Sequence, residues 1–199
     1  MSRSVDYYFT PQSPWTYLGH DRFVRIAKEA GCAVNLMPTD YGKVFPVSGG
    51  LPLGQRAPQR QAYRLVDLAR FSTLLKIPLN LKPKFFPVAG DDAARLIIAV
   101  HRQDGADVAL KLSGAVFRAV WAQERNIADE ATLAQLLSEN GMSGDRLAQS
   151  REPAVQQQYE ANTAKAIEIG VFGAPSYVIG GEIFWGQDRL EFVEQALRQ

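Results

Sequence analysis

The segment that decides the fold lies near the C-terminus and reads GVFGAPSYVIGGEIFWGQDRL over residues 170–190. Its two runs of β-branched and aromatic residues, 176–179 and 182–185, are joined by two glycines, and such a pair is typical of a tight β-hairpin. The apolar residues that follow recur at the spacing of one helix face: Leu190, Val193 and Leu197. The segment therefore predicts two antiparallel strands followed by a helix.

The N-terminal segment, residues 5–19, reads VDYYFTPQSPWTYLG and predicts a different unit. Residues 5–9 have the composition of a buried strand, and the prolines that follow interrupt it. A helical period then continues to Gly31, a residue suited to a helix C-terminus, and residues 33–38 form a second candidate strand. A strand, a helix and a strand in this order predict two parallel strands with a right-handed crossover.

The region between these units, residues 55–170, shows helical periodicity throughout. Its apolar stripes are Ala62, Leu65, Val66 and Ala69; Ala94, Ile97, Ile98 and His101; Leu112, Ala115, Val116 and Ala119; and Leu133, Leu136 and Leu137. We therefore expect an α/β protein with a thioredoxin-like fold, built from residues 1–54 and 171–199. A large all-helical insertion domain, residues 55–170, interrupts it. A cleft between two such domains is a favoured place for a small ligand.

Composition excludes several classes of function. The 199 residues carry a formal net charge of +1, so no general field attracts nucleic acid or anionic lipid. No apolar run approaches the ~20 residues that span a bilayer, and the apolar run near the N-terminus is too short for a signal peptide. We therefore expect a cytoplasmic protein. Cys32 is the sole cysteine, which excludes an internal disulfide and a CxxC pair, and with two histidines no metal site is expected.

Ser13, Pro14 and Trp15 lie where the first strand gives way to the first helix. Serine at the N-cap and proline at the first helical position match the preferences of a helix start, so Ser13 can serve as a cap alone. The same place also suits an anion, because free N–H groups and the helix dipole stabilise negative charge there. Since the thioredoxin fold carries its attacking cysteine at this point, Ser13 can instead stabilise a thiolate that a ligand supplies.

Two further candidates flank the predicted hairpin. Ala174 and Pro175 precede its first strand, where they form either a plain turn or, if Pro175 is cis, a free backbone edge that pairs with an extended peptide-like ligand. Asp188 and Arg189 follow its second strand. Asp188 suits a helix N-cap, and the pair also suits the ammonium and carboxylate of an amino-acid group.

The remaining polar residues carry less information. His20, flanked by Asp21, is predicted to lie at the surface, and Arg56, Arg60 and Arg64 at helical spacing are predicted to form a solvated helix face. The segment 82–87, KPKFFP, is either a structural connector or a source of apolar walls and a cation for an acidic substrate.

Three features together carry a family resemblance: the segment 5–19, the segment 170–190 and the helical insertion between them. The chain resembles the DsbA-like branch of the thioredoxin superfamily, in particular 2-hydroxychromene-2-carboxylate isomerases and kappa-class glutathione transferases. The resemblance implies glutathione as cofactor, with Ser13 on its sulfur beside Pro14 and Trp15. Ala174, before a cis Pro175, would bind the cysteinyl part, and Asp188 with Arg189 would bind the γ-glutamyl end.

The resemblance also implies the reaction. A glutathione-dependent cis-trans isomerase would interconvert 2-hydroxychromene-2-carboxylate and trans-o-hydroxybenzylidenepyruvate, or a close aromatic analogue. A kappa-like transferase or peroxidase and a non-catalytic glutathione- or peptide-binding module are the alternatives. Isomerases of this family carry a Lys and an Asn where this chain has Pro46 and Gly50, which leaves the aromatic substrate open. A homodimer is expected, with Phe117 and Trp121 as either interface or core residues.

Overall fold

The two predicted units meet in one four-stranded sheet. The structure, a computed structural model, describes residues 4–198. Its strands are β1 (Ser4–Phe9), β2 (Ala33–Pro38), β3 (Ser176–Ile179) and β4 (Glu182–Trp185). Its helices are α1 (Pro14–Glu29), α2 (Tyr41–Ser48), α3 (Pro58–Leu75), α4 (Asp91–Asp104), α5 (Ala106–Trp121), α6 (Glu130–Glu139), α7 (Asp145–Gln149), α8 (Pro153–Glu168) and α9 (Leu190–Arg198), with 3-10 turns η1 (Leu53–Gln55) and η2 (Gln187–Arg189).

The sheet has the strand order β2-β1-β3-β4. β1 pairs in parallel with β2 and antiparallel with β3, and β3 pairs antiparallel with β4 across Gly180 and Gly181. Both predicted units are therefore confirmed, including the bounds of the hairpin. The thioredoxin-like fold class predicted from them is confirmed as well.

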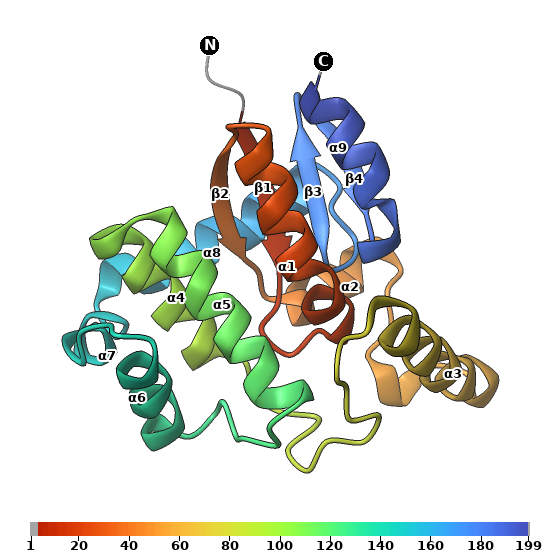
Figure 1. Cartoon of the computed structure of the whole chain (residues 1–199), viewed down its shortest axis with the longest axis horizontal. Coiled ribbons are helices and arrows are strands. Elements are labelled where there is room, and N and C mark those ends of the chain that lie inside the picture. Colours follow the sequence, from red (N-terminus) through yellow and green to blue (C-terminus); the bar gives the residue numbers. More distant parts are fainter. Residues whose placement is uncertain (1–3, 199) are drawn as a thin grey trace.

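Alternating residues of β1 supply the two faces of the sheet. Tyr7 and Phe9 point into the larger core, where Tyr7 lies against Phe23 of α1 and Tyr177 of β3. Tyr8 points to the opposite face, into a smaller core with Val44 of α2 and Ala166 of α8 among others. Because side chains of a strand alternate in direction, both faces of the sheet are covered. Figure 1 shows α1 and α9 on one face and α8 behind the other.

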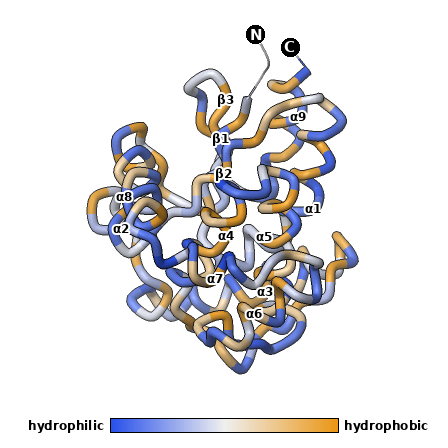
Figure 2. Tube along the Cα trace, turned by 90° about the vertical axis from the view of Figure 1, so that its left-hand side faces the viewer, coloured by the Kyte–Doolittle hydropathy of each residue, from blue (hydrophilic) through white to orange (hydrophobic). Residues whose placement is uncertain are grey.

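The helical region packs directly on the sheet domain. α5 lies along α1, and α4, α5 and α8 all contact β2 (Figure 1). Phe117 and Trp121 of α5 are fully buried in the larger core, so they are core residues and do not form an interface. The helices carry alternating hydrophobic and hydrophilic stretches, visible as stripes along the tube in Figure 2, as expected for helices with one buried face. The ends of the predicted thioredoxin-like domain, residues 1–3 and 199, lie outside the described residues.

Two local features differ from expectation. The predicted elements do not include α2, which has Pro46 inside it at the cost of one helical hydrogen bond and is capped at its start by Asp40, whose carboxylate accepts from the Gly42 N–H. In α3 the predicted apolar stripe is wrong. Leu68 is the one residue of this helix that is buried, and the partly buried Arg64 and Phe71 lie on its face.

Candidate functional site

The register of the sheet brings the three predicted site regions to one end. β1 ends at Phe9, and its Tyr8 lies opposite Ser176, the first residue of β3. Ser176 in turn lies opposite Trp185, the last residue of β4. The loops 10–13, 173–175 and 186–189 therefore all leave the sheet at the same end. Figure 1 shows this end facing the start of α1, beside α2 and α3.

Ser13 is the N-cap of α1, as predicted, and the start of this helix keeps two donors available. The Thr16 N–H donates to Ser13 Oγ over 3.2 Å, and the Tyr17 N–H donates to the Ser13 carbonyl over 3.1 Å. Pro14 has no N–H, and in residues 4–198 the N–H of Trp15 has no acceptor. The Ser13 hydroxyl proton likewise has no acceptor within that range. An N–H and an O–H at the positive end of a helix can both donate to an anion.

Aromatic side chains enclose this helix start. Pro14 is buried, and Trp15 is half-buried with its ring edge-on to Phe71 of α3, their centroids 5.9 Å apart. The Tyr17 hydroxyl donates to the Pro78 carbonyl over 2.8 Å and so ties the first turn of α1 to the segment between α3 and α4. The helical region therefore supplies one wall beside Ser13.

Ala174 and Pro175 lie beside the sheet as predicted, with a cis bond between them. The ladder of β3 with β1 begins at Ser176, so the main chain of Ala174 lies beyond its paired residues. Neighbouring groups hold the segment on both sides: the Tyr41 hydroxyl donates to the Gly173 carbonyl, and the Gly186 N–H donates to the Pro175 carbonyl, each over 2.9 Å. This leaves an edge at which an extended ligand can pair.

Asp188 and Arg189 lie in η2, immediately before α9. The predicted N-cap role of Asp188 is wrong: Gly186 precedes the turn, and the Asp188 carboxylate pairs with Arg189 at 2.7 Å instead. Both side chains are about half exposed, at 46% and 50%, so a ligand can reach them. Arg22 of α1 positions this turn by donating to the main-chain carbonyl of Gln187, over 2.8 Å, and to its side-chain oxygen.

The sole cysteine lies at the other end of the sheet. Cys32 directly precedes β2, whose first residue, Ala33, lies opposite Ser4 at the start of β1. Ser13 and Cys32 are thus separated by the full length of α1, sixteen residues or about 24 Å. Any thiol that reacts beside Ser13 must therefore come from a ligand.

The positions that depart from the isomerase pattern both lie in or next to α2. Pro46 is exposed within α2, and Gly50 follows the helix. A Cβ atom at Gly50 would stand 2.4 Å from Cδ1 of Phe45, so this conformation has no room for an asparagine there. If this protein needs the lysine cation and the asparagine amide of the isomerase pattern, other residues must supply them.

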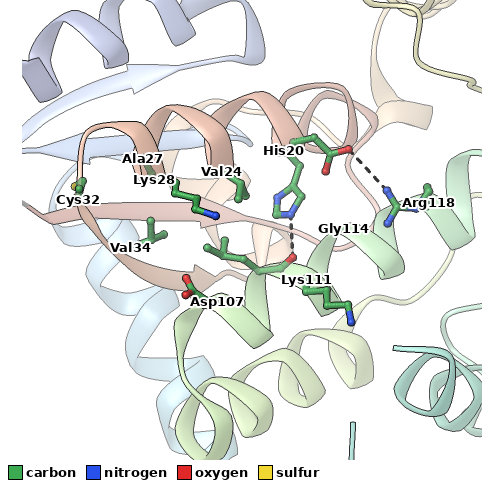
Figure 3. Close-up of a pocket in the computed structure, with 13 residues that line it drawn as sticks. His20, Val24, Ala27, Lys28, Cys32, Val34, Asp107, Lys111, Gly114 and Arg118 are labelled. Carbon is green, nitrogen blue, oxygen red and sulfur yellow. Dashed lines mark hydrogen bonds and ion pairs between the residues drawn. The ribbon is translucent and has the colours of Figure 1, made fainter. Parts of the chain in front are cut away.

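His20 is not a surface residue, contrary to the prediction. It lies in the wall of a cavity of about 600 Å³ between α1 and α5, where its ring points toward α5 (Figure 3). Its Nε2 donates to the Leu110 carbonyl over 3.0 Å, and its Nδ1 accepts from the Tyr7 hydroxyl over 3.3 Å. Burial lowers the pKa of His20 to about 4, so the ring is neutral at pH 7. The cavity contains none of the predicted site residues.

Residues 4–198 contain neither a metal-binding cluster nor a membrane-spanning helix. No group of three or more His, Cys, Asp or Glu side chains is arranged to hold a metal ion. None of the helices in this range is long and apolar enough to cross a membrane.

The fold and the site define a thioredoxin-like protein with a helical insertion and a serine at the start of its first helix. The family model of the DSBA-like thioredoxin domain matches residues 4–198, and the chain belongs to this family. It is 32% identical over 197 residues to a 2-hydroxychromene-2-carboxylate isomerase of Pseudomonas putida, covering 97% of this chain and 93% of that one. It is 24% identical to the human glutathione S-transferase kappa 1, covering 99% and 92%.

A solved structure gives the same result. The structure of a 2-hydroxychromene-2-carboxylate isomerase superposes with a TM-score of 0.81 at 29% identity, covering 98% of this chain and 94% of that chain. The resemblance predicted from the sequence motifs is therefore confirmed.

Proposed function

We propose that this protein is a glutathione-dependent isomerase acting on 2-hydroxychromene-2-carboxylate or a close aromatic analogue. The observation that carries the proposal is the separation of Ser13 from Cys32 at opposite ends of the sheet. The helix start that a thioredoxin-like protein uses for thiol chemistry has two donors available but no thiol of its own. Full-length relatives named as isomerases support the reaction class.

Glutathione fits this end of the molecule in three respects. Its sulfur would lie at Ser13, where an O–H and the Trp15 N–H are available. Its peptide backbone would pair with Ala174, which lies beyond the strand ladder. Its γ-glutamyl group would meet Asp188 and Arg189, which are accessible and of opposite charge.

When bound, glutathione would supply the nucleophilic thiolate for a reversible addition to the conjugated double bond of the ring-opened substrate, and it would be recovered unchanged. Ser13 would favour that thiolate by donating a hydrogen bond from its hydroxyl to the sulfur. Lowering the pKa of the thiol by about two units from its usual ~8.5 corresponds to about 2.7 kcal/mol and makes most of it ionised near pH 7. Pro14 and Trp15 form the adjoining apolar surface, which limits the access of water.

The proposal is tested by the stoichiometry of glutathione. An isomerase regenerates the thiol, so a small amount of glutathione supports many turnovers of trans-o-hydroxybenzylidenepyruvate, followed by its absorbance. Depletion of glutathione one for one with product would identify a kappa-like transferase, the candidate that the kappa-class relatives favour. Glutathione binding without turnover of any electrophile would identify a binding module.

Two further proposals accompany this one. The protein acts in the cytoplasm, where reduced glutathione is abundant, and it forms a homodimer. Sedimentation of the purified protein, with one species at twice the mass of the chain, tests the second.

A further inference from the structure

A partly buried arginine, Arg64, lies on the inward face of α3. The guanidinium carbon of Arg64 is 5.4 Å from the ring centroid of Phe86 and 5.7 Å from that of Trp121. One and two turns further along the same face lie Leu68, which is fully buried, and Phe71, which meets Trp15. The wall that contains Arg64 therefore extends to the first turn of α1, where Ser13 lies. The predicted solvated helix face holds only at Arg60, which is exposed: Arg64 is partly buried, and Arg56 is partly buried and precedes α3.

The positive charge of Arg64 is not balanced by a carboxylate within residues 4–198. In residues 4–198 no carboxylate pairs with Arg64, and the charge that acts on it most is that of another arginine, Arg56. Burial and this repulsion lower the pKa of Arg64 to about 10. The adjoining indole of Trp121 is fully buried, and its Nε1–H has no acceptor within the described range. The Arg64 guanidinium and the Trp121 Nε1–H are therefore two neighbouring hydrogen-bond donors without an acceptor in the described range.

Arg70 on the same helix provides a comparison, because it contacts both an aromatic ring and a carboxylate. Its guanidinium lies over the ring of Tyr63 at 5.8 Å, much as Arg64 lies over Phe86. Arg70 differs in being exposed and in pairing with Asp67 at 3.2 Å. A desolvated guanidinium gains more from a carboxylate than a solvated one does, because water screens the exposed charge.

We propose that Arg64 binds the carboxylate of an aromatic acid substrate, with the Phe86 ring as the adjoining apolar wall. The inference rests on the proposed function, which requires such an acid to lie within reach of the sulfur held at Ser13. A guanidinium matches a carboxylate with two parallel hydrogen bonds. Arg64 thereby supplies the positive charge that Pro46 does not. Lys82 and Lys84 in the segment 82–87 serve this purpose less well, because both are exposed.

The test compares an acid with its uncharged ester. Trans-o-hydroxybenzylidenepyruvate and its methyl ester are titrated into the protein saturated with glutathione, and binding is followed by quenching of tryptophan fluorescence. In Arg64→Met we expect the affinity for the acid to fall about ten- to a hundredfold, the usual effect of losing a charge-assisted hydrogen bond, and the affinity for the ester to stay unchanged. Arg70→Met, the matched control, changes neither. Arg64→Gln serves as a second charge-removing variant, and thermal unfolding checks that each variant folds.

Equal losses for acid and ester, or no loss for either, would overturn the role of Arg64. Failure of the unaltered protein to bind the acid would overturn it too. Turnover with catalytic glutathione is measured separately on the same samples. If binding depends on Arg64 but no isomerisation occurs, the proposed function is contradicted and the carboxylate site is retained. If Arg64→Met isomerises the substrate normally, the carboxylate site is contradicted and the proposed function is retained.

Discussion

Ser13, the N-cap of α1, and His20 within the helix are both buried polar residues, and their environments differ. His20, in the middle of the helix, has both ring nitrogens occupied, by the Leu110 carbonyl and the Tyr7 hydroxyl. Ser13, at the start of the helix, accepts one N–H, and its own proton has no acceptor in the described part of the chain. A buried group whose hydrogen bonds are complete serves the fold, and a group left with a donor available can serve a ligand. By this criterion His20 has a structural role, whereas Ser13 at the start of the helix is a candidate for binding a ligand.

The largest expected effect comes from removing the available donor. Ser13→Ala should lower the proposed isomerase turnover about 10²- to 10³-fold, the usual loss when one donor to a catalytic anion is removed from an enzyme site. Glutathione affinity should change little, because the contacts proposed for Ala174, Asp188 and Arg189 with the tripeptide are unaltered. Steady-state kinetics and calorimetric titration measure the two effects separately.

Ser113→Ala is the matched control for this loss. Ser113 is also buried, but its hydroxyl donates to the Ala109 carbonyl of its own helix, over 2.8 Å. This variant should keep its turnover. A Ser13→Ala protein as active as the unaltered one would show that Ser13 is a helix cap alone.

A smaller effect is expected at His20, and it concerns stability rather than turnover. The pKa of His20 is about 4 in the folded protein and about 6.5 in an unfolded chain, so the unfolded state binds the extra proton first. The stability that neutral His20 provides is complete above pH 6.5 and is lost as the pH falls toward 4, by an amount on the order of 3 kcal/mol. His20→Gln should remove this part of the slope. Urea unfolding between pH 4 and 7 measures it, and identical slopes in both proteins would contradict a neutral buried ring.

The smallest expected effect concerns the exposed ion pair of Asp188 and Arg189. Asp188→Asn should weaken glutathione binding about tenfold, through one charge-assisted contact near solvent, and leave the turnover at saturating glutathione unchanged. Glu194→Gln on α9 is the control, because Glu194 also pairs with an arginine at the surface, Arg198, but lies outside the predicted site. Unchanged affinity in Asp188→Asn would remove η2 from the glutathione site.

Local sequence signals predicted most of the fold and the place of the candidate site. The two-glycine hairpin and the Ser13-Pro14 helix start each follow from preferences within a few residues. Once the two units share a sheet, the strand directions bring Ser13, Ala174 and the turn of Asp188 to one end, as the register shows. The topology thus follows from short segments that agree with one another.

The errors concern packing between distant segments. The surface position predicted for His20, next to Asp21, is wrong because the ring lies between Tyr7 of β1 and Leu110 of α5, and the packing of α5 against α1 cannot be read from α1 alone. The available signal was Gly114 within α5, where a Cβ atom would stand 3.1 Å from Cδ2 of His20. The solvated position predicted for Arg64 is wrong because its contacts with Phe86 and Trp121 come from segments more than twenty residues away in the sequence.

The central claim, that Ser13 stabilises a thiolate supplied by glutathione, is tested most directly by titrating the thiol of bound glutathione. The ultraviolet absorbance of the thiolate, recorded against pH with the protein in excess, gives its pKa in the complex. We expect a pKa about two units below the usual ~8.5 in the unaltered protein and a return most of the way toward that value in Ser13→Ala. A bound thiol that titrates near its usual value in both proteins, or a protein that does not bind glutathione, would contradict the claim.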